Sequence, residues 1–336
     1  MEYASVIIPT LNRRDHLKRC VDSLLRNPEA SETELYISVD YPPSTKYEDG
    51  YQKVKEYVTT ITGFKKVHLF YQEKNLGPGF NRFFLMKEAE KSHSTYIFMD
   101  DDNEFSPNFL GYMNWALNTF RDDPSVYAVC AVSDYPLPVS GDYVKTHSYT
   151  PYGAGYWFKK GRQAQEFLNN KNIEEILRDK KLMKRVEQTS SNIFCYMIGD
   201  LLREVPDMRG YNDKVTYIDI WENVYCIVTD KYNILPAIPK SRNFGNDGSG
   251  VHAITGGYSG EIDSREYWPN EPRCTDEDNA IAAKLYKESH ARKPRTILRD
   301  KFALFSYRHF STPIFEFVKK ILTLRKKQEE KTVYYG

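Results

Sequence analysis

Short apolar segments alternate with amphipathic ones along the first 132 residues of the chain. The apolar segments have the length and composition of buried strands, and they lie at residues 5–9, 35–39, 67–71, 96–99 and 126–132. Between them, helical spacing of apolar residues predicts helices: one containing Leu17, Val21, Leu24 and Leu25, and others at residues 51–61, 80–91 and 106–120. Ser106 and Pro107 are expected to begin the last helix, because serine caps a helix and proline suits its first turn. This alternation predicts a mostly parallel α/β sheet with helices on both faces.

The second half of the chain is less regular. Its pattern predicts a loop rich in glycine and aromatic residues at 149–160, a polar helix at 173–187, an apolar helix at 220–228 and a glycine-rich loop at 243–250. In a sheet of the kind predicted for the first half, ligands bind beyond the carboxyl ends of the strands. Asp40, the acids at 100–102 and the turn at 10–13 all follow predicted strands, so we expect them at that edge.

Composition is typical of a soluble globular protein, with 40% hydrophobic and 28% charged residues over 336 positions. The five cysteines are odd in number and show no C-x-x-C spacing, which argues against a disulfide framework or a zinc cluster and fits a reducing compartment. The chain opens on a strand pattern rather than a signal peptide, and no apolar run has the length of a membrane span. We therefore expect a cytoplasmic protein, soluble or peripheral on the inner face of the cell membrane.

Charge is unevenly distributed, although the formal net charge is only +1. Between Arg292 and Lys327 there are eleven lysines and arginines against two acids, a local excess of +9, while the rest of the chain carries 36 basic and 44 acidic residues. An acidic body repels a phosphate backbone, so nucleic acid is not an expected partner. Residues 313–327 predict a basic amphipathic helix that either lies on an anionic membrane surface or docks on the rest of the protein; its apolar stripe contains Ile314, Val318, Ile321 and Leu322.

Three aspartates, Asp100, Asp101 and Asp102, directly follow the apolar segment at 96–99. Carboxylates crowded at the end of a buried strand repel one another and lose hydration, so they favour a bound cation. Mg²⁺ and Mn²⁺ take carboxylate oxygens and commonly bridge them to phosphate. Such a metal neutralises the charge that develops on a departing diphosphate. The alternative interpretation is a solvated acidic turn.

Four segments in order, SVIIPTLNRRDHLKRCVDSLL, LYISVD, NLGPGFNRF and YIFMDDDNEFSPNFL, resemble the successive blocks of inverting GT-A glycosyltransferases. Their pattern is similar to the large bacterial family 2 group and to N-acetylglucosaminyltransferase I, and LPAIPKSRNFGNDGSGVH resembles a later loop of both. The resemblance implies a GT-A fold, Rossmann-like with a mostly parallel sheet flanked by helices. It implies a catalytic domain at 1–255, with a nucleotide-binding half at 1–132 and an acceptor-binding half at 133–255. A basic, partly helical extension at 256–336 would follow.

The resemblance also implies roles for individual residues around the donor. Asp102, with Asp100, would ligate Mn²⁺ or Mg²⁺, and Asp100 or Asp101 would contact the ribose or the donor sugar. Asp40 matches the acid that accepts a uracil N–H, which favours a UDP-sugar, although an aspartate before two prolines is equally typical of a turn. In the family, the turn after the first strand lines the nucleotide. The residues of this chain that match that turn are Pro9, Thr10, Asn12 and Arg13.

Two glycine-containing segments are candidates for contacts with phosphate. The first leads into a predicted helix whose N-terminal N–H groups would face the donor, unless it is a plain loop-to-helix junction; its residues are Asn75, Gly77, Gly79, Asn81 and Arg82. The second contains three glycines within six positions, which allow a backbone nest around a phosphate, and we assign Asn246, Gly248 and Ser249 to the donor. His252 resembles the histidine that completes the metal site in many family members, and an imidazole ligand favours Mn²⁺ over Mg²⁺. This loop is expected to close over the donor and exclude water.

An inverting transfer needs a base that takes the proton of the acceptor hydroxyl. The position of Asp219 before the glycine-rich loop resembles that of the family's catalytic acid, with Glu222 as the second candidate and Asp200 as the third. Asp-x-x-Glu before an apolar helix is also a capping box, which is the structural alternative. Tyr156 and Trp157 resemble a glycine–aromatic loop that flanks the acceptor site, and a packed hydrophobic loop is the alternative for them.

Together these features predict a metal-dependent hexosyl- or N-acetylhexosaminyl-transferase of surface polysaccharide biosynthesis, such as capsule or O-antigen. It would move a sugar from a UDP-sugar to a glycan or lipid-linked acceptor, with inversion at the anomeric carbon. A sugar-nucleotide pyrophosphorylase, built on a similar sheet, would need a glycine-rich first turn, and residues 9–12 contain no glycine. A non-catalytic carbohydrate-binding protein, the other alternative, would not need acids clustered at a strand end.

Overall fold

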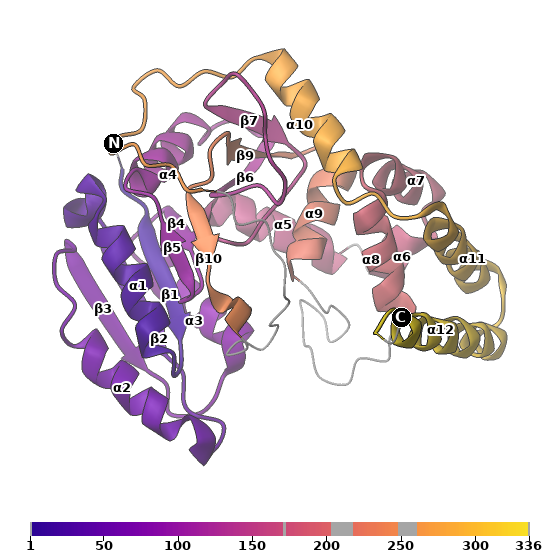
Figure 1. Cartoon of the computed structure of the whole chain (residues 1–336), viewed down its shortest axis with the longest axis horizontal. Helices are drawn as coiled ribbons and strands as arrows, with labels where there is room; N and C mark the ends of the chain where they lie inside the picture. Colours follow the sequence, from indigo (N-terminus) through magenta and orange to yellow (C-terminus); the bar gives the residue numbers. More distant parts are fainter. Residues whose placement is uncertain (1, 171–172, 203–217, 248–260, 335–336) are drawn as a thin grey trace. The chain divides into compact units, whose positions relative to one another are not determined.

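An eight-stranded sheet, whose strands lie between residues 5 and 236, forms the main β structure in a computed structural model of the chain (Figure 1). The structure describes residues 2–170, 173–202, 218–247 and 261–334. Contacts divide the chain into two compact units, of which unit 1 contains residues 1–163 and 231–282 and unit 2 contains residues 164–230 and 283–336. The domain boundaries predicted at residues 132 and 255 stay predictions.

Unit 1 contains the strands. They are β1 (Ser5–Thr10), β2 (Glu34–Val39), β3 (Lys66–Tyr71), β4 (Thr95–Phe98), β5 (Asn103–Phe105), β6 (Val126–Cys130), β7 (Tyr143–Thr146), β8 (Ala154–Trp157), β9 (Tyr232–Pro236) and β10 (Ser241–Asn243). Its α-helices are α1 (Arg14–Leu25), α2 (Glu48–Val58), α3 (Gly77–Glu90) and α4 (Phe109–Thr119), and its 3-10 turns are η1 (Pro28–Glu32), η2 (Thr45–Tyr47) and η3 (Gly245–Asp247). Two further helices run from unit 1 into unit 2, namely α5 (Phe158–Asn170) and α10 (Asp276–Glu288).

The main sheet has the strand order β3-β2-β1-β4-β8-β6-β9-β7. Strand β1 is parallel to both β2 and β4, β2 is parallel to β3, and β6 is parallel to β9. Strand β8 is antiparallel to both β4 and β6, and β7 is antiparallel to β9. A separate two-stranded sheet pairs β10 with β5. The mostly parallel sheet with flanking helices, predicted from the alternating pattern, is confirmed.

Both faces of the sheet are covered. One face packs with α1, α2 and α4 into a single hydrophobic cluster, which contains Val6 and Ile8 of β1 next to Leu35 and Ile37 of β2. Helix α3 packs on β1, β2 and β4 and buries Leu85 and Ala89. Because successive side chains of a strand point to opposite faces, a strand covered on both sides is apolar along its whole length. This is the reason that the strands of the first half were readable as apolar runs.

The predicted loop at 149–160 is wrong, because residues 154–157 form β8, between β4 and β6. Tyr156 of β8 pairs in register with Tyr96 of β4, and the two rings stack with centroids 5.1 Å apart. Aromatic residues suit a pleated surface of this kind, where they pack on cross-strand neighbours.

The predicted start of α4 is also wrong. The helix begins at Phe109 rather than at Ser106, and the Ser106 side chain bonds to Asn108 instead of capping. The cap comes from elsewhere, since Oδ1 of Asn27 accepts a hydrogen bond from the Leu110 N–H at 2.8 Å. The first turn of α4 is therefore held by a residue of the short connection between α1 and η1.

Unit 2 is helical throughout its described residues, apart from short connections. Its helices are α6 (Ile173–Arg178), α7 (Lys180–Thr189), α8 (Ser191–Leu202), α9 (Ile218–Thr229), α11 (Pro294–His309) and α12 (Thr312–Tyr334), together with the shared ends of α5 and α10. The single helix predicted at 173–187 is two helices, because Asp179 ends the first and caps the second through the N–H groups of Lys181 and Leu182. The apolar helix predicted at 220–228 and the helical C-terminal region are confirmed.

The apolar stripe predicted on the C-terminal helix is divided between solvent and the interior. Ile314 and Ile321 are exposed on α12, whereas Leu322 is buried, as is Phe315. The exposed face also contains Phe317. No helix in the described part of the chain is long and apolar enough to cross a membrane.

The hydroxyl of Tyr112 provides a test of how α4 is attached to the sheet. This buried hydroxyl lies 3.0 Å from the carbonyl oxygen of Cys130 in β6 and 3.1 Å from that of Ile234 in β9. We expect Tyr112→Phe to lower the free energy of unfolding by about 1–2 kcal/mol, because a buried hydrogen bond is lost without a replacement. Urea unfolding measures the change.

The control is Tyr71→Phe, at an exposed tyrosine of β3, for which a change within about 0.5 kcal/mol is expected. Equal unfolding midpoints for the two variants would contradict this account of the α4–sheet contact.

Candidate active site at the carboxyl end of β4

Three aspartates lie in the turn between β4 and β5, at the edge of the sheet where β1 also ends. Asp101 and Asp102 are buried and Asp100 is partly exposed. Thr10, the last residue of β1, donates a hydrogen bond from its hydroxyl to Asp101 Oδ2 at 2.7 Å. The sequence prediction that these acids share one edge with the turn at 10–13 is therefore correct in its geometry.

One guanidinium group links two of these acids. Arg13 lies between β1 and α1, and its Nη1 is 2.9 Å from Asp102 Oδ2, while its Nη2 forms an ion pair with Asp101. Loss of hydration, together with the negative charges of Asp102 and Asp101, raises the pKa of Asp100 to about 7. The positive charges of Arg82 and Arg13 act in the opposite direction but do not offset this rise. The cluster therefore favours additional positive charge.

Asp102 is also held from the far side by the segment that contains β10. Asn243 donates from its side-chain amide to Asp102 Oδ1 at 2.7 Å, and the Phe244 N–H donates to the Asp102 carbonyl at 2.8 Å. Gly245 lies so close that a Cβ atom there would overlap Asp102 Oδ2 and lie 3.0 Å from Asp102 Cγ. Gly245 was predicted to be part of a phosphate nest, and the role of Asn243 was not predicted, although Asn243 belongs to the segment that carries the resemblance.

The carboxylate oxygens of this cluster suit a hard divalent cation that also binds phosphate oxygens of a ligand. Among the residues that the structure describes, no group of three or more His, Cys, Asp and Glu side chains could hold a metal ion. Mg²⁺ is nevertheless bound in many proteins by one or two carboxylates, with phosphate oxygens and water completing its shell. Asp100 and Asp102 fit that mode. The predicted ligand His252 and the predicted phosphate contacts Gly248 and Ser249 lie outside the described residues.

Asp40 lies at the end of β2 and accepts four hydrogen bonds. The N–H groups of Tyr41, Leu76 and Gly77 donate to it at 2.8–2.9 Å, and the Asn75 amide donates at 3.3 Å. Burial raises the pKa of Asp40, and the three N–H groups act in the opposite direction. Asp40 thus fixes the start of α3, where the first residue, Gly77, has a φ of +75° that favours glycine.

The first turns of α3 face the sheet. Asn81 bonds through its amide to the carbonyl of Ser38 at 3.1 Å, and the Ser38 hydroxyl donates to its Oδ1, so its polar atoms hold α3 to β2. The guanidinium of Arg82 lies 3.9 Å from the centroid of the Phe98 ring and contacts the Tyr156 hydroxyl at 3.4 Å. Asn81 and Arg82 were both predicted to contact the nucleotide-sugar. Of the two, Arg82 is the one whose positive charge acts on the cluster, where it opposes the rise in the pKa of Asp100.

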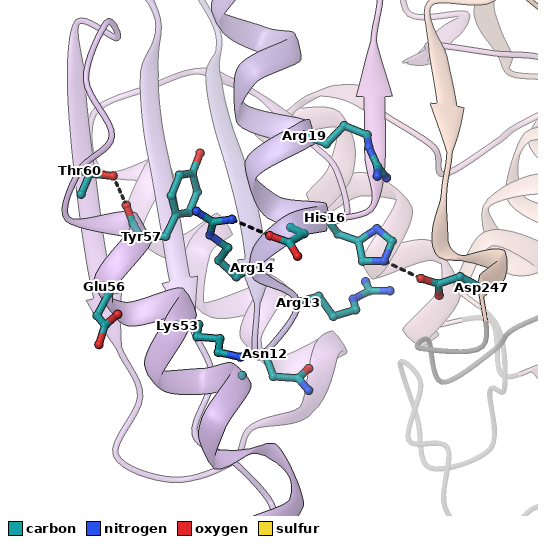
Figure 2. A pocket seen from close by; sticks show the side chains of 12 residues that line it. Asn12, Arg13, Arg14, His16, Arg19, Lys53, Glu56, Tyr57, Thr60 and Asp247 are labelled. Carbon is teal, nitrogen blue, oxygen red and sulfur yellow. Dashed lines mark hydrogen bonds and ion pairs between the residues drawn. The ribbon is translucent and has the colours of Figure 1, made fainter.

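A pocket of about 940 Å³ adjoins the cluster and shares Arg13 with it (Figure 2). It lies along the first turns of α1, and its wall includes the predicted nucleotide residue Asn12. Nε2 of His16 is 2.8 Å from Oδ2 of Asp247, which joins η3 to the start of α1 (Figure 2). The basic side chains that line the pocket are Arg13, Arg14, His16, Arg19 and Lys53, and the acidic ones are Asp15, Glu56 and Asp247.

The remaining residues of unit 1 that were predicted to bind the nucleotide-sugar or the acceptor lie in β1, η3 and β8. Pro9 is buried in β1 opposite Ser38, and Asn246 lies in η3 between Gly245 and Asp247. Tyr156 and Trp157 are only 1% and 4% exposed, and the Trp157 N–H donates to the Leu117 carbonyl at 2.9 Å. Neither ring of β8 presents a face to an acceptor, which agrees with the alternative of hydrophobic packing.

The candidate bases belong to unit 2. Helix α9 begins at Ile218, so Asp219 lies within its first turn and is partly exposed, whereas Glu222 is 2% exposed. An acid in a first helical turn is favoured by the helix dipole, which is a structural reason for Asp219 independent of catalysis. Asp200 lies in α8.

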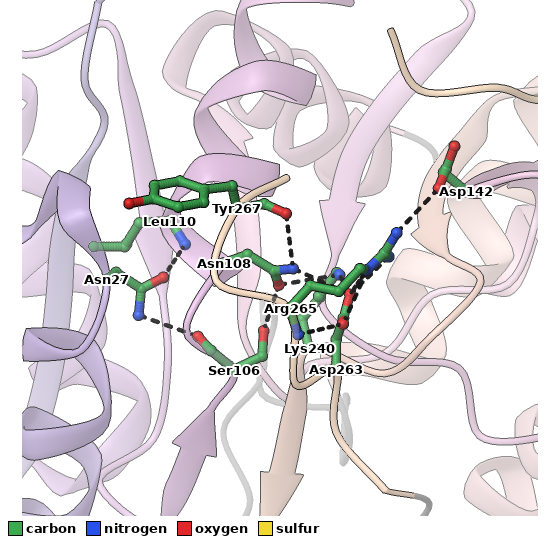
Figure 3. Close-up of polar contacts among 9 residues, drawn as sticks. All are labelled: Asn27, Ser106, Asn108, Leu110, Asp142, Lys240, Asp263, Arg265 and Tyr267. Carbon is green, nitrogen blue, oxygen red and sulfur yellow. Dashed lines mark hydrogen bonds and ion pairs between the residues drawn. The ribbon is translucent and has the colours of Figure 1, made fainter. Parts of the chain in front are cut away.

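A buried polar network holds both β10 and the start of α4 in unit 1 (Figure 3). Lys240, which precedes β10 and is fully buried, forms an ion pair with Asp263 and donates to Asn108 Oδ1 at 3.1 Å. Arg265 also pairs with Asp263, at 2.7 Å. Burial alone would raise the pKa of Asp263, but Arg265 and Lys240 more than offset this and hold the pKa well below its usual range. A lysine directly after the apolar stretch 234–239 was the only sequence signal for this network.

Comparison with known proteins gives one family. The family model described as Glycosyl transferase family 2 matches residues 5–186, slightly more than half of the chain. No curated protein sequence matches the chain.

Solved structures give weaker likenesses. TarS of S. aureus is similar with a TM-score of 0.35 at 17% identity, over 54% of this chain and 32% of the TarS chain. TarS 1-349 in complex with UDP is similar with a TM-score of 0.34 at 20% identity, over 54% of this chain and 52% of that one. Mannosyltransferase PcManGT from Pyrobaculum calidifontis, in complex with GDP-Man and Mn²⁺, has a TM-score of 0.38 at 11% identity, over 97% of this chain and 88% of that one. The chain thus spans a third to a half of the TarS chains, and likenesses at these scores carry no argument about donor or acceptor.

The contact between Gly245 and Asp102 predicts a sensitive position. A methyl group at residue 245 must push the Asp102 carboxylate from its place between Arg13 and Asn243. If the cluster holds a divalent metal together with a nucleotide, as the resemblance implies, Gly245→Ala should weaken that binding by roughly 10- to 100-fold, the range found when groups that orient a metal ligand are changed. Isothermal titration calorimetry measures the affinity. The matched control is Gly161→Ala, since nothing lies within 4 Å of a Cβ atom there; equal losses in both variants would contradict the account.

The Lys240–Asp263 pair predicts an acid-sensitive contribution to stability. Because the pKa of Asp263 is depressed in the folded protein, its contribution is present above the unfolded value of about 3.9 and is lost as the pH falls further, through the folded value. Asp263→Asn should cost about 3–5 kcal/mol near pH 7, because Lys240 stays buried without its partner. Urea unfolding as a function of pH should show this cost shrinking below about pH 4.

The double variant Lys240→Met with Asp263→Leu serves as the control. It removes both charges from the buried site and should recover most of the stability. A cost that is independent of pH, or a double variant no more stable than Asp263→Asn, would contradict the buried ion pair as the cause.

Proposed function

Because the chain belongs to glycosyl transferase family 2, we propose that it transfers a sugar from a UDP-sugar to a hydroxyl group of a glycan or lipid-linked acceptor, with inversion. Membership of the family, together with the mixed sheet and the helical C-terminal region, confirms the predicted GT-A fold class and favours glycosyl transfer over the pyrophosphorylase and carbohydrate-binding alternatives. The observation that carries the proposal is the group of three aspartates at the carboxyl end of β4, where Arg13 forms ion pairs with two of the carboxylates and leaves the group with an excess of negative charge.

The donor diphosphate would bind beside this group. Asp102 and Asp100 would hold Mn²⁺ or Mg²⁺, with His252 as a further ligand, and the metal would neutralise the charge that develops on the departing UDP. Arg13 would then turn from Asp102 toward the phosphates, since both are anionic and within reach of one flexible side chain. The basic lining of the adjoining pocket supports this placement of negative charge. Arg82 would act on the donor from α3, and Asn246, Gly248 and Ser249 from the loop.

Uracil recognition would fall to Asp40. Its carboxylate already accepts four donors, and a carboxylate has about four acceptor positions. The Asn75 amide at 3.3 Å is the longest of these bonds and so the one that a uracil N–H would replace most readily. Pro9, Thr10 and Asn12 would line the same nucleotide from the end of β1.

The acceptor hydroxyl would lose its proton to Asp219. This residue is partly exposed, whereas Glu222, one turn further along α9, is buried and less accessible to an acceptor. A positioned base contributes about 10²- to 10⁴-fold to the rate of such a step. Tyr156 and Trp157, the predicted acceptor contacts, would need to leave the packed interior to bind a sugar and are not part of this mechanism.

We place this reaction in surface polysaccharide biosynthesis, with a hexose or an N-acetylhexosamine as the transferred sugar. The protein would work in the cytoplasm, peripherally on the inner face of the membrane, where lipid-linked acceptors are found. The excess of basic residues between Arg292 and Lys327 supports this location.

Donor class and metal dependence can be tested together. A thermal-shift panel of nucleotide sugars should show stabilisation by UDP-sugars that depends on Mn²⁺ or Mg²⁺, because ligands that bind the folded state raise its melting temperature. Asp102→Asn should abolish the metal-dependent part of the shift. Asp122→Asn, at an exposed acid before β6, should keep it. A shift with GDP-sugars alone would reject UDP, and a full shift in Asp102→Asn would reject the metal site.

The base is tested by separating transfer from binding. Asp219→Asn should lower the transfer rate by about 100-fold or more while UDP affinity stays unchanged. Asp230→Asn is the matched control, because it changes an acid of unit 2 at a positive-φ position that asparagine tolerates. A nearly full rate in Asp219→Asn would rule this residue out and leave Glu222 as the candidate.

A further inference from the structure

Helices α11 and α12 expose large apolar side chains in a regular pattern. On α11 these are Leu298, Phe302 and Phe305, spaced by four and three residues, so that they lie on one face of the helix. On α12 they are Ile314, Phe317 and Ile321, spaced by three and four. Leu298 is 70% exposed and Phe317 is 66% exposed, which is unusual for side chains of this size.

The two exposed faces are joined at the turn between the helices. The rings of Phe305 and Phe310 meet edge to face at 5.9 Å, and His309 lies 4.6 Å from Phe305. Different residues hold the two helices together, since Phe315 is buried and its ring contacts that of Tyr307 at 5.4 Å. The exposed side chains are therefore not needed for the packing of the helix pair. We refer to Leu298, Phe302, Phe305, Phe310, Ile314, Phe317 and Ile321 as the apolar ridge.

A pocket of about 320 Å³ opens beside this ridge, between α7, α8 and α11. Its floor is apolar, with Met183, Phe194 and Leu304, all of which are buried. Its basic side chains are Lys180, Lys184, Lys301, Arg308 and His309, against a single acid, Glu187, which pairs with Lys301 at 2.6 Å. Phe305 belongs both to this pocket and to the apolar ridge.

An apolar floor with a basic rim suits an anionic amphiphile. A phosphate group would be attracted to Lys180 and Lys184, while the adjoining hydrocarbon would contact the floor and Phe305. Apolar side chains on one side and lysines and arginines around them are also the composition of segments that lie in a membrane interface. The surrounding segment has the charge for this, with eleven basic residues against two acids between Arg292 and Lys327.

We infer that unit 2 binds an anionic phospholipid surface, with the apolar ridge inserted into the interface and a lipid phosphate in the pocket between α7, α8 and α11. A symmetric contact with a second copy is less favourable, because it would bring two segments of charge +9 together. This inference deepens the membrane part of the proposed function and does not depend on the donor or the metal. It also extends the predicted membrane surface from α12 to α11 and α7.

Vesicle co-sedimentation of the full chain tests the inference. Vesicles of phosphatidylcholine with phosphatidylglycerol should sediment the protein, and vesicles of phosphatidylcholine alone should do so far less. Raising the ionic strength should weaken binding to the anionic vesicles, because salt screens the basic side chains. Equal sedimentation with both lipids, or none with either, would overturn the inference.

Two pairs of variants separate the ridge from the pocket. Phe305→Ser with Phe317→Ser should weaken binding roughly tenfold or more through lost insertion, and Lys180→Ala with Lys184→Ala should weaken it on the order of tenfold for anionic vesicles only. The matched controls are Tyr71→Ser with Tyr267→Ser, at exposed aromatic residues of unit 1, and Lys65→Ala with Lys66→Ala, at exposed lysines where β3 begins. Losses of the same size in the controls would contradict the assignment to unit 2.

Two further measurements keep the outcomes distinct. Circular dichroism melts confirm that each variant folds, and Mn²⁺-dependent UDP binding of each variant should equal that of the parent protein. If UDP binding persists while no variant changes vesicle binding, the membrane surface is rejected and the proposed transfer stands. If sedimentation velocity shows self-association that Phe305→Ser with Phe317→Ser abolishes, and vesicles are not bound, the ridge is an interface between copies and the inference fails.

Discussion

The ion pairs of Arg13 with Asp101 and Asp102 are the interaction on which the account of the site depends. They join the turn after β1 to the turn after β4, and they place one positive charge against three neighbouring carboxylates. One guanidinium group balances three carboxylates only in part, and burial together with the charges of Asp102 and Asp101 raises the pKa of Asp100 to about 7. Three carboxylates opposite one guanidinium group attract a further cation. A nucleotide diphosphate can bind the same cation.

The surroundings of the cluster fix its geometry from two directions. On one side Thr10 and Arg13 come from the end of β1, and on the other Asn243 and Gly245 come from the segment at the end of β10. That segment is anchored in turn by Lys240, whose buried ion pair with Asp263 leaves little freedom for the backbone before β10. A catalytic carboxylate gains from such support, because small displacements of a metal ligand weaken binding.

The sequence predicted the parts of this structure that depend on neighbouring residues. Strands covered on both faces appear as apolar runs, so β1 to β4 and β6 were readable, and the three aspartates were readable as the end of such a strand. Contacts between distant residues were not. Asn27 caps α4 from 83 positions away, and Asn243 reaches Asp102 from 141 positions away. Strand β8 was missed for the same reason, since its partners β4 and β6 lie elsewhere in the chain. Helical spacing predicted an apolar stripe on α12, but it could not show which apolar residues of that helix pack on α11.

Anomalous diffraction from crystals soaked with MnCl₂ and UDP tests the central claim most directly. We predict a manganese peak in contact with an Asp102 carboxylate oxygen and with the UDP diphosphate, and a guanidinium of Arg13 that has left Asp102 for a phosphate. UDP bound at the end of β1 with no manganese near Asp102, and with Arg13 still paired to both aspartates, would contradict the claim that these acids exist to hold a metal.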